Sequence, residues 1–488
     1  MKKALAFNHE KYLKIQKKEI LNRIAKFDKK LYLEFGGKLL DDFHAARVLP
    51  GFEPDAKAQL LLSLKDKLEV LIVVNAEDII AHKVRNDSGI SYDAEVEKMI
   101  KSFNRLGLSI CGIVMSFYRQ SQLADEFMLK MENRGIKVYK HYAINGYPKN
   151  IPLILSDDGL GRNEYVETKK PLVVVTAPGP GSGKMATCLS QLYHDNKRGI
   201  KSGYAKYETF PIWNLPLKHP VNLAYEAATV DIDDVNMIDP YHLEHYGITA
   251  VNYNRDVETF PLLKAIFDNI YGASPYYSPT DMGVNMAGFA ISNNDAAIEA
   301  CKQEVIRRYF CTIKNNYLGR YKDECVLKAE FLMNQLNVSV QDRKCVEKTL
   351  QKANECGELC VAMELPNGKI VTGRRSELFS APAALLLNAL KVLGKIDDSL
   401  PLLSRNVIVP IQDLKINDLH NHNPRIHAEE VLIALAIAAN TNPLAAIAMK
   451  NIHKLKGSQA HSSYLLHQVD IHTFHKLGID VTEELKPY

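Results

Sequence analysis

Apolar runs alternate with amphipathic segments along the first third of the chain. The short runs are rich in Val, Ile and Leu, as buried strands are, and the longer segments repeat apolar residues at helical spacing. Such alternation predicts right-handed crossovers and a Rossmann-like, mostly parallel sheet. After a charged helix over 10–30, the predicted strands of this sheet are 31–35, 70–74, 110–115 and 138–141, with helices over 93–105 and 120–134. A further predicted strand, 171–176, either belongs to the same sheet or begins a second lobe.

The pattern changes in the rest of the chain. Residues 199–290 are rich in Tyr, Pro, Asn and Asp with little periodicity, which indicates a binding surface or an extended ordered insertion. Residues 292–356 show helical spacing, and apolar runs on both sides of Pro366-Asn367-Gly368 predict a β-hairpin. The predicted domains are a Rossmann-like α/β domain over 1–285, a helical subdomain over 286–356 and a C-terminal α/β domain over 357–488.

Composition and charge narrow the class of protein. A chain of 488 residues with 46% hydrophobic and 24% charged residues is typical of a globular protein with two or three cores. A net charge of +4, without a basic stripe interleaved with aromatic residues, argues against a nucleic-acid partner. No apolar run approaches the ~20 residues of a membrane span, so we expect a cytoplasmic protein without a membrane partner.

The eight cysteines form no Cys-x-x-Cys pair. Cys356 and Cys360 are four residues apart, but a zinc or redox site needs partners that the sequence does not supply. The spacing therefore predicts free thiols in a reducing compartment rather than a disulfide framework.

A glycine-rich loop follows the last of the predicted strands, in the segment PLVVVTAPGPGSGKMATCLSQLY over 171–193. Glycine adopts positive φ at little cost and brings backbone N–H groups close to an anion, and the following helix adds the positive end of its dipole. A lysine at the helix start supplies a full charge. The loop predicts a phosphate site rather than a structural Gly/Pro turn; its residues are Gly179, Gly181, Ser182, Gly183 and Lys184.

This loop departs from the P-loop pattern GxxxxGK[ST] at both ends. Pro178 stands where the first glycine belongs, and Met185 replaces the hydroxyl residue that holds Mg²⁺. Thr187 lies about 200° around the helix from Met185, so it does not substitute for that hydroxyl. The sequence thus indicates an anionic ligand without defining the reaction.

Several segments together resemble a known family. They are NEYVETKKPLVVVTAPGPGSGKMATCLSQLYHD, LEFGGKLLDDFHAARVLPGFEPD near the start, SPTDMGVNMAG in the middle and LKGSQAHSS near the end. Across essentially the whole chain they resemble a bacterial domain-of-unknown-function family of about this length. The resemblance implies an N-terminal Rossmann-like part, smaller helical and α/β parts toward the C-terminus, and no established reaction.

Other polar residues are candidates to complete a site beside the loop. Gly36 and Gly37 follow the first predicted strand and form either a second phosphate loop or a tight turn. Arg374 precedes a predicted helix and indicates either an anion site or an exposed basic turn. Candidates to position a second substrate, act in catalysis or hold a metal are Lys206, His219, Asp231 and Asp233.

Histidines cluster in the C-terminal part. In DLHNHNPRIHAEE, Asn423-Pro424 predicts a helix start, which would place His427 and Glu430 on one helix face. With His420 and His422 on the preceding loop, the four side chains are candidates to hold a divalent metal. Their spacing fits no established motif, and glutamate in a first helical turn is also favoured by the helix dipole alone.

Three functions remain open. The leading hypothesis is a protein that binds a nucleotide or phosphorylated small molecule, as a phosphoryl-transfer or ligase-type enzyme, with a divalent metal as a further cofactor. The second is a non-catalytic phosphate-ligand sensor or assembly protein, which Met185 favours. The third is a metal-dependent hydrolase that uses the C-terminal histidines. In each case we expect a homo-oligomer with a small anionic ligand.

Overall fold

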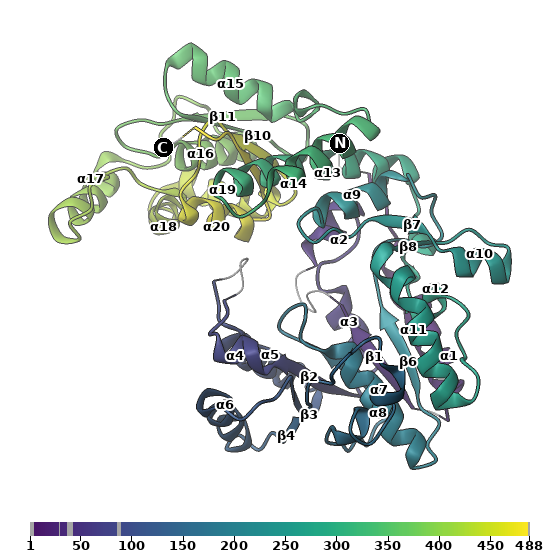
Figure 1. The fold of residues 1–488 in the computed structure, drawn as a ribbon. Coiled ribbons are helices and arrows are strands. Elements are labelled where there is room, and N and C mark those ends of the chain that lie inside the picture. Colours follow the sequence, from purple (N-terminus) through teal and green to yellow (C-terminus); the bar gives the residue numbers. More distant parts are fainter. Residues whose placement is uncertain (1–3, 29, 37–41, 85–88, 487–488) are drawn as a thin grey trace. The chain divides into compact units, whose positions relative to one another are not determined.

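The protein forms two compact units in a computed structural model that describes residues 4–28, 30–36, 42–84 and 89–486 (Figure 1). The larger unit consists of Leu5–Glu226 and Asp234–Ile298. The smaller unit consists mainly of Glu299–Tyr488, together with the short segment Ala227–Asp233. A finer division of the smaller unit at residue 357 stays a prediction.

A seven-stranded sheet forms the centre of the larger unit, and all its neighbouring strands run parallel. The order is β4-β3-β2-β5-β1-β6-β9. Strand β5 (Leu172–Thr176) therefore lies between β1 (Leu31–Phe35) and β2 (Leu68–Asn75). This confirms the predicted α/β sheet, and it shows that the strand before the glycine-rich loop belongs to the same sheet. The other strands are β3 (Ser109–Ser116), β4 (Val138–Lys140), β6 (Gly203–Tyr207) and β9 (Gly283–Val284).

Two helices cover opposite faces of this sheet. The hydroxyl of Tyr32 in β1 donates to a carboxylate of α8 (Lys184–Lys197) over 2.8 Å. Tyr207 of β6 lies three positions after the residue that pairs with Tyr32, so it points to the other face, and there its hydroxyl bonds to Tyr12 of α1 (His9–Ala25).

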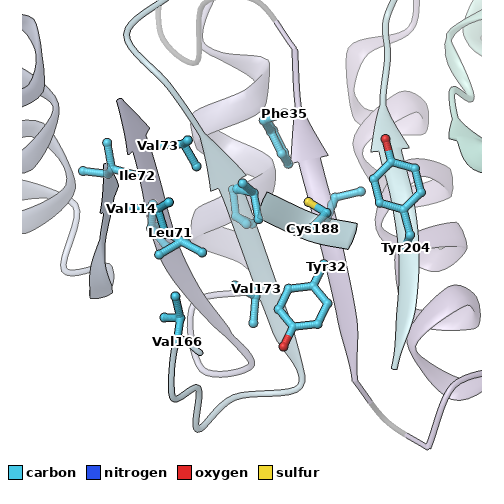
Figure 2. Close-up of a cluster of buried hydrophobic side chains, with 14 of the residues drawn as sticks. Tyr32, Phe35, Leu71, Ile72, Val73, Val114, Val166, Val173, Cys188 and Tyr204 are labelled. Atoms are coloured by element: carbon cyan, nitrogen blue, oxygen red, sulfur yellow. The ribbon is translucent and has the colours of Figure 1, made fainter. Parts of the chain in front are cut away.

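The core of the larger unit lies on both faces of the sheet. Strands β1 and β5 are buried along their whole length, which suits their β-branched and aromatic residues. Figure 2 shows Val173 of β5 beside Tyr32 of β1, its partner in the sheet, among other buried side chains of β2, β3 and β6. The same view includes Cys188 of α8, which is fully buried.

The remaining elements of the larger unit complete these layers. The region 199–290, which shows little periodicity in the sequence, contributes two sheet strands and the long helix α11. The helices are α2 (Phe43–Val48), α3 (Ala56–Ser63), α4 (Ala76–Ile80), α5 (Tyr92–Arg105), α6 (Gln122–Glu132), α7 (Ile151–Ile154), α9 (Pro220–Ala228), α10 (Pro240–Tyr246), α11 (Asn254–Tyr271) and α12 (Pro279–Met282), with a two-stranded ribbon of β7 (Asn236–Ile238) and β8 (Val251–Tyr253).

The smaller unit contains a mixed four-stranded sheet of order β11-β10-β12-β13. Its first two strands, β10 (Cys360–Glu364) and β11 (Ile370–Arg374), form the predicted antiparallel hairpin. No helix in the described part of the chain is long and apolar enough to cross a membrane. The other elements are α13 (Asn294–Tyr317), which begins in the larger unit, α14 (Asp323–Gln335), α15 (Lys344–Cys356), α16 (Ala381–Gly394), α17 (Arg405–Asp413), α18 (Ala428–Ala438), α19 (Pro443–Lys450), α20 (Gln468–Lys476), β12 (Gln459–Ser462) and β13 (Asp480–Glu483).

Candidate functional site

The glycine-rich loop joins the carboxyl end of β5 to the start of α8. Gly181 and Gly183 have φ angles of 71° and 85°, in the left-handed region that residues with a Cβ rarely adopt. Gly183 is the residue before the first turn of α8, and no side chain caps that turn. Because β5 is central in a parallel sheet, the loop lies at the edge where such folds bind ligands.

Close packing also requires glycine in this loop. A Cβ atom on Gly179 would lie 2.3 Å from the hydroxyl oxygen of Tyr92, the first residue of α5. A Cβ atom on Gly183 would lie 3.0 Å from the Cβ atom of Ser116, at the end of β3. The loop is therefore fitted against two neighbouring elements, and glycine is needed for space as well as for conformation.

Two serine hydroxyls fix the path of the loop. Ser182 donates to the carbonyl oxygen of Gly179 over 2.7 Å, and Ser116 donates to the carbonyl oxygen of Ser182 over the same distance. The side chain of Ser182, predicted to contact a ligand, is thus turned into the loop and is 1% exposed. Only its backbone N–H group can contribute to an anion site in this conformation.

The loop leaves hydrogen-bond donors without protein partners. Within the described part of the chain, the backbone N–H groups of residues 181–185 donate to no protein acceptor. The half-buried Lys184 makes no hydrogen bond or salt bridge with a described residue. Backbone donors, the positive end of the α8 dipole and an uncompensated ammonium group together form a favourable environment for a phosphate group.

A second polar cluster lies at the carboxyl end of β6, on the face that α8 covers. Lys206 pairs in register with Glu34 of β1, whose carboxylate accepts a hydrogen bond of 2.8 Å from Tyr204. The ammonium group of Lys206 lies 2.5 Å from Asp256 Oδ2 and 3.2 Å from Glu208 Oε1. We call Lys206, Glu208, Tyr253 and Asp256 the β6 cluster; within it, Tyr253 donates to Glu208 over 3.0 Å and also bonds to Lys206.

Burial controls the ionisation of the β6 cluster. It raises the pKa of Glu208 to about 7, while the Lys206 ammonium lowers that pKa and the Asp256 carboxylate raises it further. Burial lowers the pKa of Lys206, but the carboxylates of Asp256 and Glu208 outweigh this effect and hold it above its usual value. The β6 cluster therefore contains a lysine that stays protonated and a carboxyl group that exchanges a proton near neutral pH.

The thiol of Cys188 in α8 is influenced by Glu34 of β1 and by Lys184 of the glycine-rich loop. Burial raises the pKa of its thiol; the carboxylate of Glu34 raises it further and the ammonium of Lys184 opposes this. Both charged groups thus act on one side chain, four residues into α8. The β6 cluster also lies on the sheet face that is covered by α8, the helix that starts at the glycine-rich loop.

Other predicted site residues of the larger unit lie in separate settings. Gly36 directly follows β1 and its carbonyl oxygen accepts a hydrogen bond of 3.3 Å from Lys57, whereas Gly37 lies outside the described residues. His219 has both ring nitrogens engaged, one with Asn294 at 3.0 Å and the other with the N–H group of Val221 at 3.2 Å. Burial lowers the pKa of His219, so its ring is neutral around pH 7.

The predicted aspartates belong to the smaller unit. Asp231 and Asp233 lie in the segment Ala227–Asp233, and both are exposed. Asp233 pairs with Lys328 of α14, and burial together with the Asp231 carboxylate raises the pKa of Tyr321 to about 12. Arg374 also belongs to this unit, where it is the exposed last residue of β11. The roles predicted for these three residues stay predictions.

The helix predicted from Asn423-Pro424 begins later than expected. Helix α18 starts at Ala428, and His427 is the residue before its first turn rather than part of a helical face. The reason is tertiary: Ile426 exchanges backbone hydrogen bonds with Leu378 and Ser380, which holds the chain extended up to that point. The predicted common helix face of His427 and Glu430 was therefore wrong.

Of the four residues predicted to bind a metal, His427 and Glu430 contact other protein groups and the two others are exposed. His427 Nδ1 lies 2.9 Å from Asp470 Oδ2, and Glu430 accepts hydrogen bonds from the His427 backbone N–H and from Lys415, both over 2.7 Å. His420 and His422 are exposed. Among the residues that the structure describes, no three His, Cys, Asp or Glu side chains are grouped as metal ligands would be.

Sequence reasoning missed several residues that shape the site. Tyr92 and Ser116 determine the packing of the loop, and Glu34, Tyr253 and Asp256 surround Lys206. They come from α5, β3, β1, β8 and α11, so no local spacing connects them. The one available signal was that polar residues near the carboxyl ends of parallel strands meet at the same edge.

Similarity to known proteins covers nearly the whole chain. The family described as "Domain of unknown function DUF1846, N-terminal" matches residues 5–337, and its C-terminal counterpart matches residues 341–487. A UPF0371 protein of Streptococcus pyogenes (strain Manfredo) is 54% identical over 480 residues, covering 98% of this chain and 97% of that protein. A UPF0371 protein of Streptococcus equi subsp. zooepidemicus (strain H70) is 55% identical over 480 residues, covering 98% and 96%.

Proposed function

We propose that this chain, which belongs to the DUF1846 family in both its N-terminal and C-terminal parts, is a cytoplasmic protein that binds a nucleotide or a phosphorylated small molecule. One observation carries the proposal. The loop after the central strand of a parallel sheet presents Lys184 and backbone N–H groups that have no acceptor among the described residues, all at the start of α8. A phosphate group satisfies these donors and compensates the positive charge.

The neighbouring β6 cluster supports an enzyme of phosphoryl-transfer or ligase type. In such a reaction, Lys184 and the loop N–H groups neutralise charge on the phosphate. Glu208, whose pKa is about 7, accepts a proton from the group that attacks, and Lys206 orients the second substrate. His219 takes no part in this proposal, because it does not belong to the β6 cluster and its ring nitrogens bond to Asn294 and Val221 instead.

The alternative is a non-catalytic sensor or assembly protein that uses the same loop. Met185 favours it, because the loop lacks the hydroxyl that holds Mg²⁺ in ordinary nucleotide hydrolases. Both functions require phosphate binding, and they differ in turnover.

Calorimetric titration tests the shared requirement. ATP and inorganic phosphate are titrated into wild type, Lys184→Ala and Lys201→Ala, with and without Mg²⁺. Lys201 is an exposed lysine before β6, at the opposite edge of the sheet, and serves as a charge-matched control. Loss of a charge-assisted hydrogen bond should weaken binding by Lys184→Ala about tenfold or more. Equal binding by wild type and Lys184→Ala, or no binding at all, would reduce the loop to a structural turn.

Two further variants separate the candidate functions. Glu208→Gln keeps the shape of the β6 cluster but cannot accept a proton, so an enzyme should retain phosphate binding and lose turnover of ATP in the presence of a metabolite library. Binding without turnover in wild type would favour the sensor. Met185→Ser restores the missing hydroxyl, and stronger binding of ATP only when Mg²⁺ is present would show that the surrounding carboxylates can support a metal.

A further inference from the structure

Two cysteine thiols meet in the smaller unit. Cys356 is the last residue of α15 and Cys360 is the first residue of β10. Gly357 between them has a φ of 67°, which turns the chain so that the two sulfur atoms lie 3.5 Å apart. Both thiols are free, and the sulfur atoms need to approach by only about 1.5 Å to reach the bonding distance of a disulfide.

Two cations lie near the pair, and one of its two thiols is partly exposed. Arg374 lies opposite Cys360 in the β10–β11 hairpin, and Lys352 lies one helical turn before Cys356. Both cations lower the pKa of the Cys360 thiol, while burial and the neighbouring Cys356 raise it to about 12. Cys360 is buried, whereas Cys356 is partly exposed and can meet a reagent from solvent.

We propose that Cys356 and Cys360 are a redox-active dithiol that a small organic disulfide converts reversibly to an intramolecular disulfide. The thiolate of Cys356 attacks one sulfur of the reagent, forming a mixed disulfide and releasing one thiolate. The thiolate of Cys360 then attacks the Cys356 sulfur, the protein disulfide forms and the second reagent thiolate leaves. The reagent is reduced to two thiols, which take up the two protons that the cysteines lose.

Cys356 and Cys360 belong to the smaller unit, and the function proposed for the larger unit does not involve them. A disulfide here would tie the end of α15 to the start of β10, two elements that already pack together. It would also remove the titratable thiol of Cys360, which lies opposite Arg374 in the hairpin. The proposal does not depend on phosphate binding by the larger unit.

Peptide mass analysis of the full-length protein tests the proposal directly. Both cysteines fall in a single tryptic peptide, 353–369, because Lys352 and Lys369 are consecutive cleavage sites. Native protein is equilibrated with glutathione disulfide, alkylated with iodoacetamide and digested. We expect this peptide to carry no alkyl group and to be two hydrogen atoms lighter than the dithiol form. Treatment with dithiothreitol should return a peptide with two alkyl groups.

Variants distinguish the pair from adventitious oxidation. Cys356→Ser should abolish the internal disulfide, and Cys311→Ser, which removes a partly buried cysteine of α13, should leave it unchanged. Arg374→Gln should slow closure about threefold, as loss of a nearby cation lowers the thiolate fraction. Two alkyl groups on the peptide after equilibration, or a disulfide that forms only in urea, would overturn the proposal.

Discussion

Among single residues, Glu208 gives the larger unit a specific dependence on pH. Its folded-state pKa of about 7 lies above its ordinary value of 4.5 because the carboxyl is buried. The stabilisation it contributes is complete below about pH 4.5 and is lost as the pH rises through 7. Relative to wild type, Glu208→Gln should therefore gain stability between pH 5 and pH 8, by up to about 3 kcal/mol.

Denaturation followed by tryptophan fluorescence measures this effect. Trp213 is the single tryptophan of the chain and belongs to the larger unit, so its signal reports unfolding of that unit. Glu244, an exposed residue of α10, provides the matched control, and Glu244→Gln should keep the pH dependence of wild type. If the stability of wild type and of Glu208→Gln falls in parallel as the pH rises, the pKa of Glu208 is not raised by burial, and the prediction is wrong.

At this same scale, the sequence predicted the residues of the loop and missed their neighbours. Gly179, Gly181 and Gly183 lie in the short segment between β5 and α8, and Lys184 is the first residue of α8, so their pattern is visible locally. Asp256 lies fifty residues from Lys206, and only the packing of α11 beside β6 brings their charges together. Local patterns identify a loop, whereas a buried ionic cluster depends on the tertiary fold.

At the scale of elements, the contacts at the start of α18 lead to a test of whether the C-terminal histidines bind a metal. His427 contacts Asp470, and the carboxylate of Glu430 caps the start of the helix. We expect His427→Ala to destabilise the smaller unit by about 1–2 kcal/mol, with or without a chelator, because it removes a contact at the helix start. His420→Ala and His422→Ala, at exposed positions, should have little effect.

Thermal unfolding with and without EDTA, together with elemental analysis of the purified protein, provides the measurement. The metal hypothesis predicts a different pattern: one bound divalent ion, a loss of stability in EDTA, and similar losses for all three histidine variants. That pattern would show that the four side chains rearrange around a metal.

The elements themselves were predictable where the sequence pattern was strong. Strand β1 has its predicted bounds, and β2, β3 and β5 lie where the apolar runs indicate. Helix α11 was missed because Pro261 lies inside it, and β6 was missed because its sequence, GYAKY, contains no Val, Ile or Leu. In these elements tertiary packing outweighs local propensity.

At the scale of the whole molecule, the contacts of α15 and of Arg343, the residue before it, predict which fragment of the smaller unit folds alone. The buried Arg343 donates to the carbonyl oxygens of Ala460 and Asp480, and Thr349 donates to that of His461 over 3.0 Å. A fragment of residues 357–488 lacks these donors and exposes the sheet face that α15 covers. We expect it to lack cooperative unfolding, whereas a fragment of 294–488 should unfold cooperatively.

Circular dichroism of the two fragments, recorded during thermal unfolding, makes the comparison. Fragment 294–488 keeps α13 whole and retains the pairing of Lys314 with Glu483, so it is the matched control. A cooperative transition of equal midpoint in both fragments would support an independent C-terminal domain over 357–488.

The position of β5 between β1 and β2 governs how the chain can assemble during its synthesis. When the ribosome has delivered residues up to 170, both outer neighbours of β5 are present but the strand that joins them is not. The first segment must also wait for a much later one, because Ala6, Asn8 and Gln16 bond to residues 284–292. We therefore expect the nascent larger unit to stay open, with apolar strand edges uncovered, until residues 284–292 have been synthesised.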